Sequence, residues 1–224
     1  MHQFLLTICP IFLWIFAAFQ LFMLIRFFRE YGKTKNMLFL LSGLVACGLF
    51  YDSLILALGT VLPEGGLLKG LSQVRYISHG GLIPLLLPIC AYALDMKKTG
   101  KTIVWAITGL LIAVGLGSGI VTVTTPESVG TVRYAMDSAA TPGWASTVST
   151  TVLAFGMVIP LIIAGIIVWK KQKTPALFLS GFLMFLFSGL GAVDMEMMFF
   201  ISMFGEALMV LFFMVYAKFR EKKA

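Results

Sequence analysis

Apolar residues fall into long runs along this chain, and short polar segments separate them. The runs cover residues 4–25, 36–60, 76–95, 102–123, 149–169, 175–193 and 195–217. About 20 mostly apolar residues are enough for an α-helix to cross the hydrocarbon core of a bilayer. Because lipid offers no hydrogen-bond partners to the backbone, and because the runs do not alternate as barrel strands do, they must be helices. The pattern predicts an all-α membrane protein, with a single domain over residues 1–224 that forms a seven-transmembrane-helix bundle.

Two connections between the runs carry further information. The last two runs are separated only by residues 194–196, where Gly189 and Gly191 are expected to permit a tight turn. Residues 124–148 form the one long connection and are rich in Thr, Ser and Gly. Within it, residues 121–125 and 131–135 predict the strands of a small β-hairpin around a turn at 126–130. We expect this hairpin either to cap the mouth of the bundle or to be a mobile loop.

The basic residues are distributed unequally between the two ends of the predicted bundle. Fourteen of the 17 Lys and Arg residues lie on the side that holds the C-terminus, and only Lys69, Arg75 and Arg133 lie on the other. The positive-inside rule therefore predicts an N-terminus outside and a C-terminus in the cytoplasm of a multi-pass cell-membrane protein. The basic residues at Arg26 and Arg29, after a long first run, also favour a permanent first helix over a cleaved signal peptide.

Composition narrows the range of functions. Only 12% of residues are charged, against about 25% in a typical soluble domain. The net charge of +7 is explained by the bias toward one end, so nucleic acid is not an expected partner. Two histidines and three scattered cysteines predict no metal site and no disulfide framework. No catalytic constellation is visible, and we expect the protein not to be an enzyme.

A few ionisable residues fall inside the predicted membrane segments, where they usually face the bundle interior. Asp52 lies in the second run, and Arg75 and His79 are one helical turn apart at the outer end of the third. We expect these three around one outer polar pocket. The structural alternatives are an Asp52–Arg75 ion pair, an Arg75 side chain that extends to the outer interface, and a hydrogen-bonded core histidine.

Glu206 lies near the middle of the last run, and no Lys or Arg is expected at its depth. An isolated carboxylate there would be very costly, so we expect the protonated acid, which can donate a hydrogen bond or exchange its proton. The structural alternative is an acid that bonds to a neighbouring helix carbonyl.

The third run resembles the third helix of the microbial rhodopsin family, in which Arg-Tyr at the outer end is followed by Pro-Leu-Leu-Leu. The matching residues here are Arg75-Tyr76 and Pro84 with Leu85 to Leu87. Tyr51 falls where the family has a tyrosine that faces the central cavity, and the glycines of Gly115-x-Gly117 are similar to its fourth helix. The resemblance implies an opsin-like bundle with a central cavity.

The chain departs from that family at the residues that hold its chromophore. The family binds retinal through a lysine in its seventh helix, but no lysine occurs between Lys173 and Lys218. Ser78 replaces the acid of the family's third helix, and Phe182 and Phe185 lie where its sixth helix has a Trp-containing aromatic pattern. We therefore expect no covalent cofactor and no retinal Schiff base.

Three hypotheses of function follow. The first is a retinal-free opsin-like protein that binds an apolar ligand or lipid non-covalently as a sensor or signalling partner. The second is a proton, ion or small-solute transporter or channel that uses intramembrane ionisable groups, and the third is a membrane assembly subunit. The ligand- or ion-binding candidates are Glu206, Asp52, His79, Arg75, Ser78, Tyr51, Phe182 and Phe185. Beyond the lipid bilayer and a hydrophobic small molecule, the sequence leaves open a homo-oligomer or a membrane partner protein.

Overall fold

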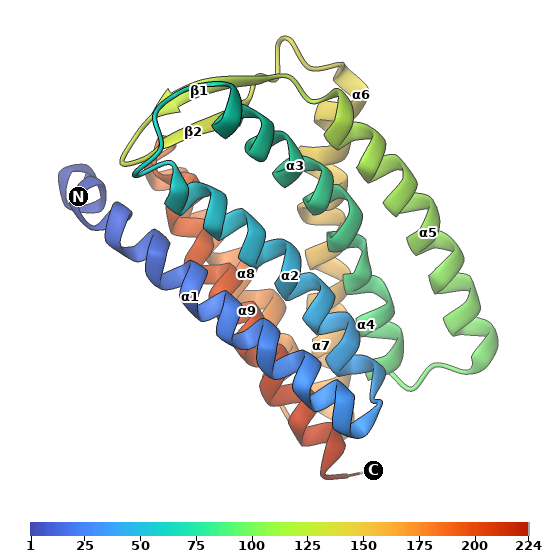
Figure 1. Cartoon of the computed structure of the whole chain (residues 1–224). Helices are drawn as coiled ribbons and strands as arrows, with labels where there is room; N and C mark the ends of the chain where they lie inside the picture. The colour runs from blue at the N-terminus through green and yellow to red at the C-terminus, as the bar shows by residue number, and fades with distance from the viewer. Residues whose placement is uncertain (224) are drawn as a thin grey trace.

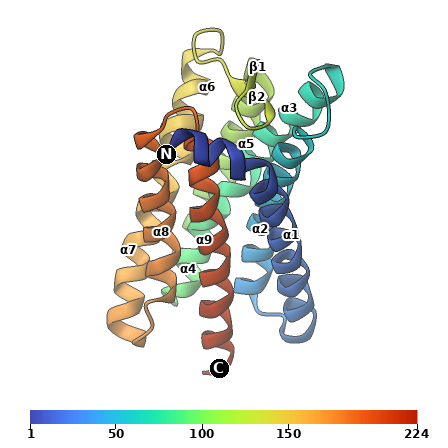
Figure 2. The same ribbon diagram turned by 90° about the vertical axis from the view of Figure 1, so that its left-hand side faces the viewer.

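The computed structural model of the chain describes residues 1–223. Within this range, seven helical spans are long and apolar enough to cross a membrane, as predicted. The two chain ends lie at opposite ends of the resulting bundle (Figures 1 and 2). The spans are α1 (His2–Thr34), α2 (Met37–Leu58), α3 with α4 (Gly66–Leu82 and Leu86–Ala93), α5 (Lys98–Val121), α6 with α7 (Gly143–Thr147 and Phe155–Gln172), α8 (Ala176–Leu190) and α9 (Met198–Glu221).

The third span begins earlier than its hydropathy predicts. Helix α3 starts at Gly66 rather than at residue 76, because Leu68 is buried with Ile55 and Tyr134, although glycines and Lys69 lower the hydropathy around it. Arg75 lies well inside α3 rather than at its outer end.

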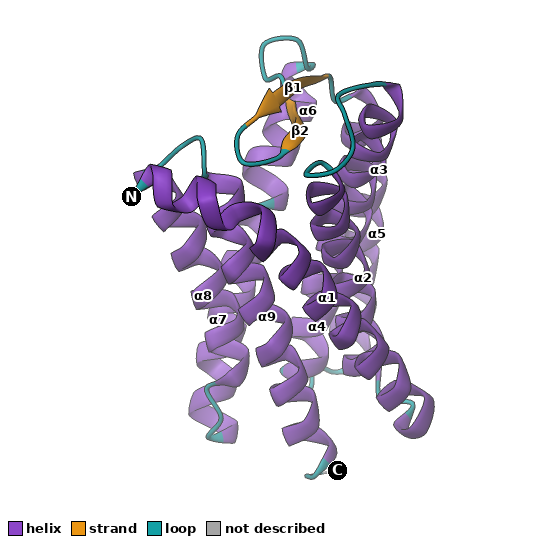
Figure 3. Ribbon diagram, turned by 60° about the vertical axis from the view of Figure 1, so that its left-hand side comes forward, coloured by secondary structure: helices purple, strands orange, loops and turns teal. Residues whose placement is uncertain are grey.

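Helix α1 carries Pro10 in its interior, and its first turns run across the end of the bundle before the helix descends (Figures 2 and 3). A proline removes one backbone hydrogen bond and commonly bends a helix at this point. His2 Nδ1 lies 2.8 Å from Asp194 Oδ2, which joins the tip of α1 to the turn between α8 and α9. That turn occupies the residues after Gly191, close to the predicted break, whereas Gly189 remains inside α8.

Two spans contain local departures from α-helical geometry. A 3₁₀ turn at Ile83–Leu85 separates α3 from α4 around Pro84. A π-helical segment at Val148–Leu153 separates α6 from α7. Widened π-helical turns are frequent at functional sites, because they change the direction of the side chains that follow.

The long connection forms the predicted hairpin, from β1 (Thr124–Ser128) and β2 (Val132–Met136), paired antiparallel. The turn is shorter than predicted and centres on Gly130, whose φ of 68° suits a residue without a Cβ. The hairpin covers the end of the bundle near the N-terminus (Figure 3). The Thr131 hydroxyl donates to Leu56 O at 2.8 Å, and the Val132 amide donates to Gly59 O at 3.0 Å.

Glycines set the close packing of α3 against α5. A Cβ at Gly115 would lie 2.2 Å from Gly80 O, and one at Gly119 would lie 2.7 Å from the backbone of Ile77. Small residues such as these let two membrane helices approach closely. Toward the C-terminal end, a large buried apolar core joins α1, α2, α4, α7, α8 and α9. The polar residues of interest lie between this core and the hairpin.

Candidate functional site

An ion pair joins α2 to α3 in the half of the bundle that the hairpin covers. Arg75 Nε lies 2.8 Å from Asp52 Oδ1, and the two side chains are only 11% and 14% exposed. The guanidinium carbon also lies 5.1 Å from the ring centroid of Tyr76. The expected ion pair is therefore present, and the alternative in which Arg75 extends to the outer interface is wrong because its partner is inside the bundle.

The ion pair borders a polar cavity of about 300 Å³. Asp52, Arg75 and His79 all line it, as expected for one outer pocket, and so does Glu206 from α9. The expectation that no basic residue shares the depth of Glu206 is thus wrong: the longer α3 places Arg75 on the wall of the same cavity. The remaining lining residues are Leu56, Tyr76, Gly80, Met136, Ser149, Thr150, Leu153, Phe199 and Ser202.

Two polar atoms at this cavity lack partners among the residues that the structure describes. They are Glu206 Oε2 and Arg75 Nη1, both on buried side chains. Buried polar groups are nearly always hydrogen-bonded, so an unpaired acid and an unpaired guanidinium nitrogen on one cavity indicate a place for water or for a polar ligand. The alternative for Glu206, a bond to a neighbouring helix carbonyl, is not formed by that oxygen.

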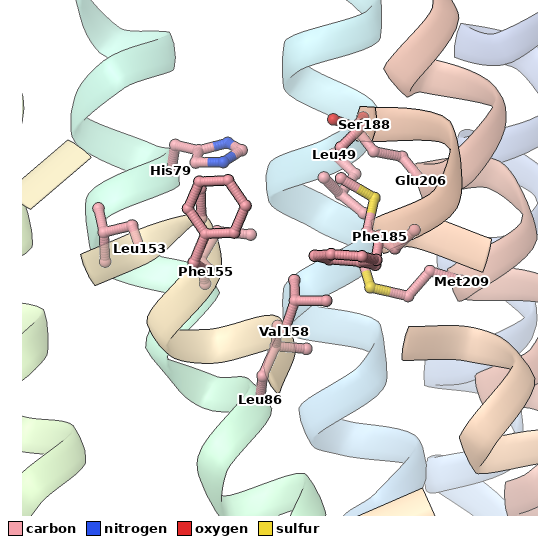
Figure 4. A pocket seen from close by; sticks show the side chains of 13 residues that line it. Leu49, His79, Leu86, Leu153, Phe155, Val158, Phe185, Ser188, Glu206 and Met209 are labelled. Atoms are coloured by element: carbon pink, nitrogen blue, oxygen red, sulfur yellow. The ribbon is translucent and has the colours of Figure 1, made fainter. Parts of the chain in front are cut away.

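A second, apolar cavity of about 110 Å³ adjoins the first. His79, Leu153 and Glu206 line both cavities. Figure 4 shows His79 and Glu206 on opposite walls, with Phe155 and Phe185 beneath them in the view. The other lining residues are Leu49, Ile83, Leu86, Ala154, Val158, Met184, Ser188 and Met209. Glu206 therefore lies at the boundary between a polar and an apolar space.

The hairpin contributes to the site as a cover. Met136 of β2 lines the polar cavity, and the Tyr76 hydroxyl donates to Tyr134 O at 3.2 Å. The Arg133 guanidinium carbon lies 4.2 Å from the ring centroid of Phe199, another lining residue, and pairs with Glu127 across the hairpin. These contacts favour the cap over the mobile loop.

Three candidates from the sequence lie away from both cavities. The Tyr51 hydroxyl donates to Leu71 O at 3.0 Å, so it joins α2 to α3. The Ser78 hydroxyl donates to Arg75 O within its own helix. Phe182 stacks on Phe178 and is partly exposed on the outside of the bundle, whereas Phe185 lines the apolar cavity.

Sequence reasoning missed the contribution of the π-helical segment. Ser149, Thr150 and Leu153 line the polar cavity from Val148–Leu153, a stretch that reads as the start of an ordinary helix. A run of Ser and Thr at the entry to an apolar segment is the only signal that could have identified these residues.

The groups gathered here can bind hydrogen-bonding or charged ligands, and three of them, Asp52, His79 and Glu206, can exchange protons. In residues 1–223, no group of three or more His, Cys, Asp or Glu residues is placed to hold a metal ion. No family model matches the chain, and no curated protein matches it in sequence.

Proposed function

We propose that the chain is a retinal-free, opsin-like protein of the cell membrane that binds a small amphipathic molecule non-covalently and acts as a sensor. The observation that carries the proposal is the position of Glu206, whose unpartnered Oε2 lies where a polar and an apolar cavity meet. A ligand with a polar group and a short apolar chain would satisfy both spaces. The resemblance of the third helix to microbial rhodopsins supports the opsin-like part of the proposal.

Cavity size restricts the ligand. An engineered apolar cavity of about 150 Å³ binds benzene, so the 110 Å³ space beside Glu206 accommodates a chain of about four carbons. The polar cavity, at about 300 Å³, reaches the lower limit of ordinary small-molecule sites, roughly 300–1,000 Å³. A long polyene such as retinal does not fit the apolar cavity.

The test uses three five-carbon probes, pentylamine, 1-pentanol and pentanoate, added to the purified chain. We expect at least one to raise the melting temperature with concentration, because ligand at 100 times its Kd stabilises the folded state by about 2.7 kcal/mol. The probe that acts identifies the charge of the preferred polar group.

Two variants make the test specific. Leu153→Trp places a large side chain on the wall shared by both cavities and should abolish the shift, while Phe182→Leu, which lies outside them, should retain it. A chain that no probe stabilises, and that carries no co-purified small molecule in a solvent extract, would contradict the proposal.

A second candidate function is proton transport, because Asp52, His79 and Glu206 are three titratable groups on one cavity. Against it, the apolar cavity borders Leu86 and Met209 of the buried core, and this core lies between the site and the C-terminal end. A proton flux in proteoliposomes would favour transport over sensing if Glu206→Gln abolishes it, because the amide retains hydrogen bonding but cannot titrate.

A further inference from the structure

A groove on the outer surface of the bundle combines exposed lysines with the aromatic rings of Trp169 and Phe178. It lies between α7 and α8 near their connection, has a volume of about 470 Å³, and is lined by Ile166, Trp169, Lys170, Lys173 and Phe178. None of its lining residues belongs to the candidate ligand site.

The groove is bounded by a tight crossing of the two helices. A Cβ at Gly165 would lie 2.4 Å from Phe178 Cα, so α7 and α8 touch backbone to backbone there. Larger side chains beside this contact, Trp169 and Phe178, have ring centroids 5.4 Å apart. Phe178 in turn stacks on Phe182 at 5.3 Å, which extends the apolar surface along α8 toward the middle of the span.

The charge and the exposure of the residues around the groove indicate which kind of molecule covers it. Trp169 is 46% exposed, and Ile166 and Phe182 are also exposed, although they belong to helices apolar enough to span a membrane. Lys170 and Lys173 are exposed at the end of the same helix, and no acidic residue among those described forms an ion pair with either of them. Tryptophan favours the headgroup level of a membrane, and basic pockets between helices at that level attract anionic headgroups.

We infer that this groove binds an anionic phospholipid. The phosphate-bearing headgroup lies against Lys170 and Lys173, and one acyl chain follows the surface made by Trp169, Phe178 and Phe182. The inference concerns a site separate from the cavities and does not depend on the proposed function.

The experiment measures quenching of Trp169 fluorescence by lipids with brominated acyl chains, in the full chain reconstituted in bilayers. The Trp169 signal is the difference between the chain and its Trp169→Phe variant, because three other tryptophans are present. We expect brominated phosphatidylglycerol to quench at a lower mole fraction than phosphatidylcholine with the same chains. Since one lysine near a membrane surface contributes about 1 kcal/mol, this preference should fall about fivefold for each lysine removed.

The matched variants are Lys170→Gln/Lys173→Gln and Lys97→Gln/Lys98→Gln. The second pair removes the same charge from Lys97 and Lys98 at the start of α5, which lies at the same end of the bundle (Figure 1). We expect the preference to disappear only in the first pair. An equal loss of the preference for phosphatidylglycerol in both variants would show that anionic lipids are attracted to basic residues at this end of the bundle in general, and would overturn the site. A Trp169 that neither lipid quenches, because a second copy of the chain covers the groove, would overturn it as well.

Discussion

Arg75 has two carboxyl side chains on its cavity but forms an ion pair with only one of them. Asp52 is its partner at 2.8 Å, while Glu206 shares the cavity and lies within electrostatic range of both. An arginine cannot lose its charge inside a protein, whereas a carboxyl group can gain a proton. Glu206 is therefore placed to act as a reserve counter-ion when Asp52 is neutralised.

This arrangement predicts that Asp52 and Glu206 are coupled. Asp52→Asn should lower the free energy of unfolding by only about 1–2 kcal/mol, less than the roughly 3–5 kcal/mol usual for a broken buried pair, because Glu206 ionises in its place. Glu206→Gln alone should have a smaller effect. In the double variant the loss should exceed the sum of the single losses by about 1 kcal/mol or more, since Arg75 then has no carboxylate. Equilibrium unfolding of the purified variants measures all three, and additive losses would show that Glu206 is not a counter-ion.

At the scale of single residues, the sequence predicted the ionisable residues of the site and the pocket shared by Asp52, Arg75 and His79, but not that Glu206 lines the same pocket. Asp52, Arg75, His79 and Glu206 were predictable because ionisable side chains in apolar runs are rare. The proximity of Glu206 to Arg75 was not predictable, because it depends on where α3 begins. Tyr51 does not line the cavity, contrary to the prediction, because its hydroxyl donates a hydrogen bond to a backbone carbonyl of α3.

At the scale of elements, hydropathy located the spans but not their ends. The first turns of α3 carry Lys69 and Gln73, which lower the hydropathy of the segment, yet the segment stays helical. Its stability comes from contacts that only the fold creates: Gln73 Nε2 donates to Gly119 O at 2.5 Å, and the Tyr134 hydroxyl donates to Gly65 O at 3.3 Å. The hairpin register shifted in the same way, because the strands extend through Pro126 and Glu127 that the sequence placed in the turn.

The connection between α4 and α5 is held to α9 by one carboxylate. Arg220 donates to both oxygens of Asp95, at 2.6 and 2.8 Å, and these hydrogen bonds hold the pKa of Asp95 below its ordinary value. A carboxyl with a lowered pKa stabilises the folded state above its unfolded pKa and loses this effect as pH falls through the folded value.

Asp95→Asn should therefore destabilise the chain at neutral pH but not in strong acid. The side chain is largely exposed, so the expected loss at pH 7 is only about 0.5–1 kcal/mol. Asparagine also tolerates the left-handed backbone at this position, where φ is 53°, so the change tests the charge rather than the turn. The difference between the melting temperatures of the two proteins should begin to shrink near pH 4, the ordinary pKa of aspartate, and should vanish only below the lowered pKa of Asp95 in the folded protein. A difference that stays constant with pH would assign the effect to packing.

At the scale of the whole molecule, the charge asymmetry read from the sequence follows the two ends of the bundle. The connections α1–α2, α4–α5 and α7–α8 lie at the end that holds the C-terminus, and the hairpin lies at the other (Figures 1 and 2). Fourteen of 17 basic residues belong to the first end. The hairpin end carries the polar cavity, so orientation decides from which side of the membrane a ligand reaches Glu206.

We predict that the hairpin end faces outward. Short, strongly basic connections remain in the cytoplasm, and the lysine-rich connections here are short. Cys9 and Cys90 are buried, so a Cys47→Ser background leaves no exposed thiol among residues 1–223. In that background, Ser138→Cys beside the hairpin should react with a membrane-impermeant maleimide in intact cells, and Lys98→Cys should react only after the membrane is permeabilised, since both positions are exposed. Labelling with the opposite pattern would place the cavity on the cytoplasmic side, and the ligand proposed for Glu206 would then have to be an intracellular molecule.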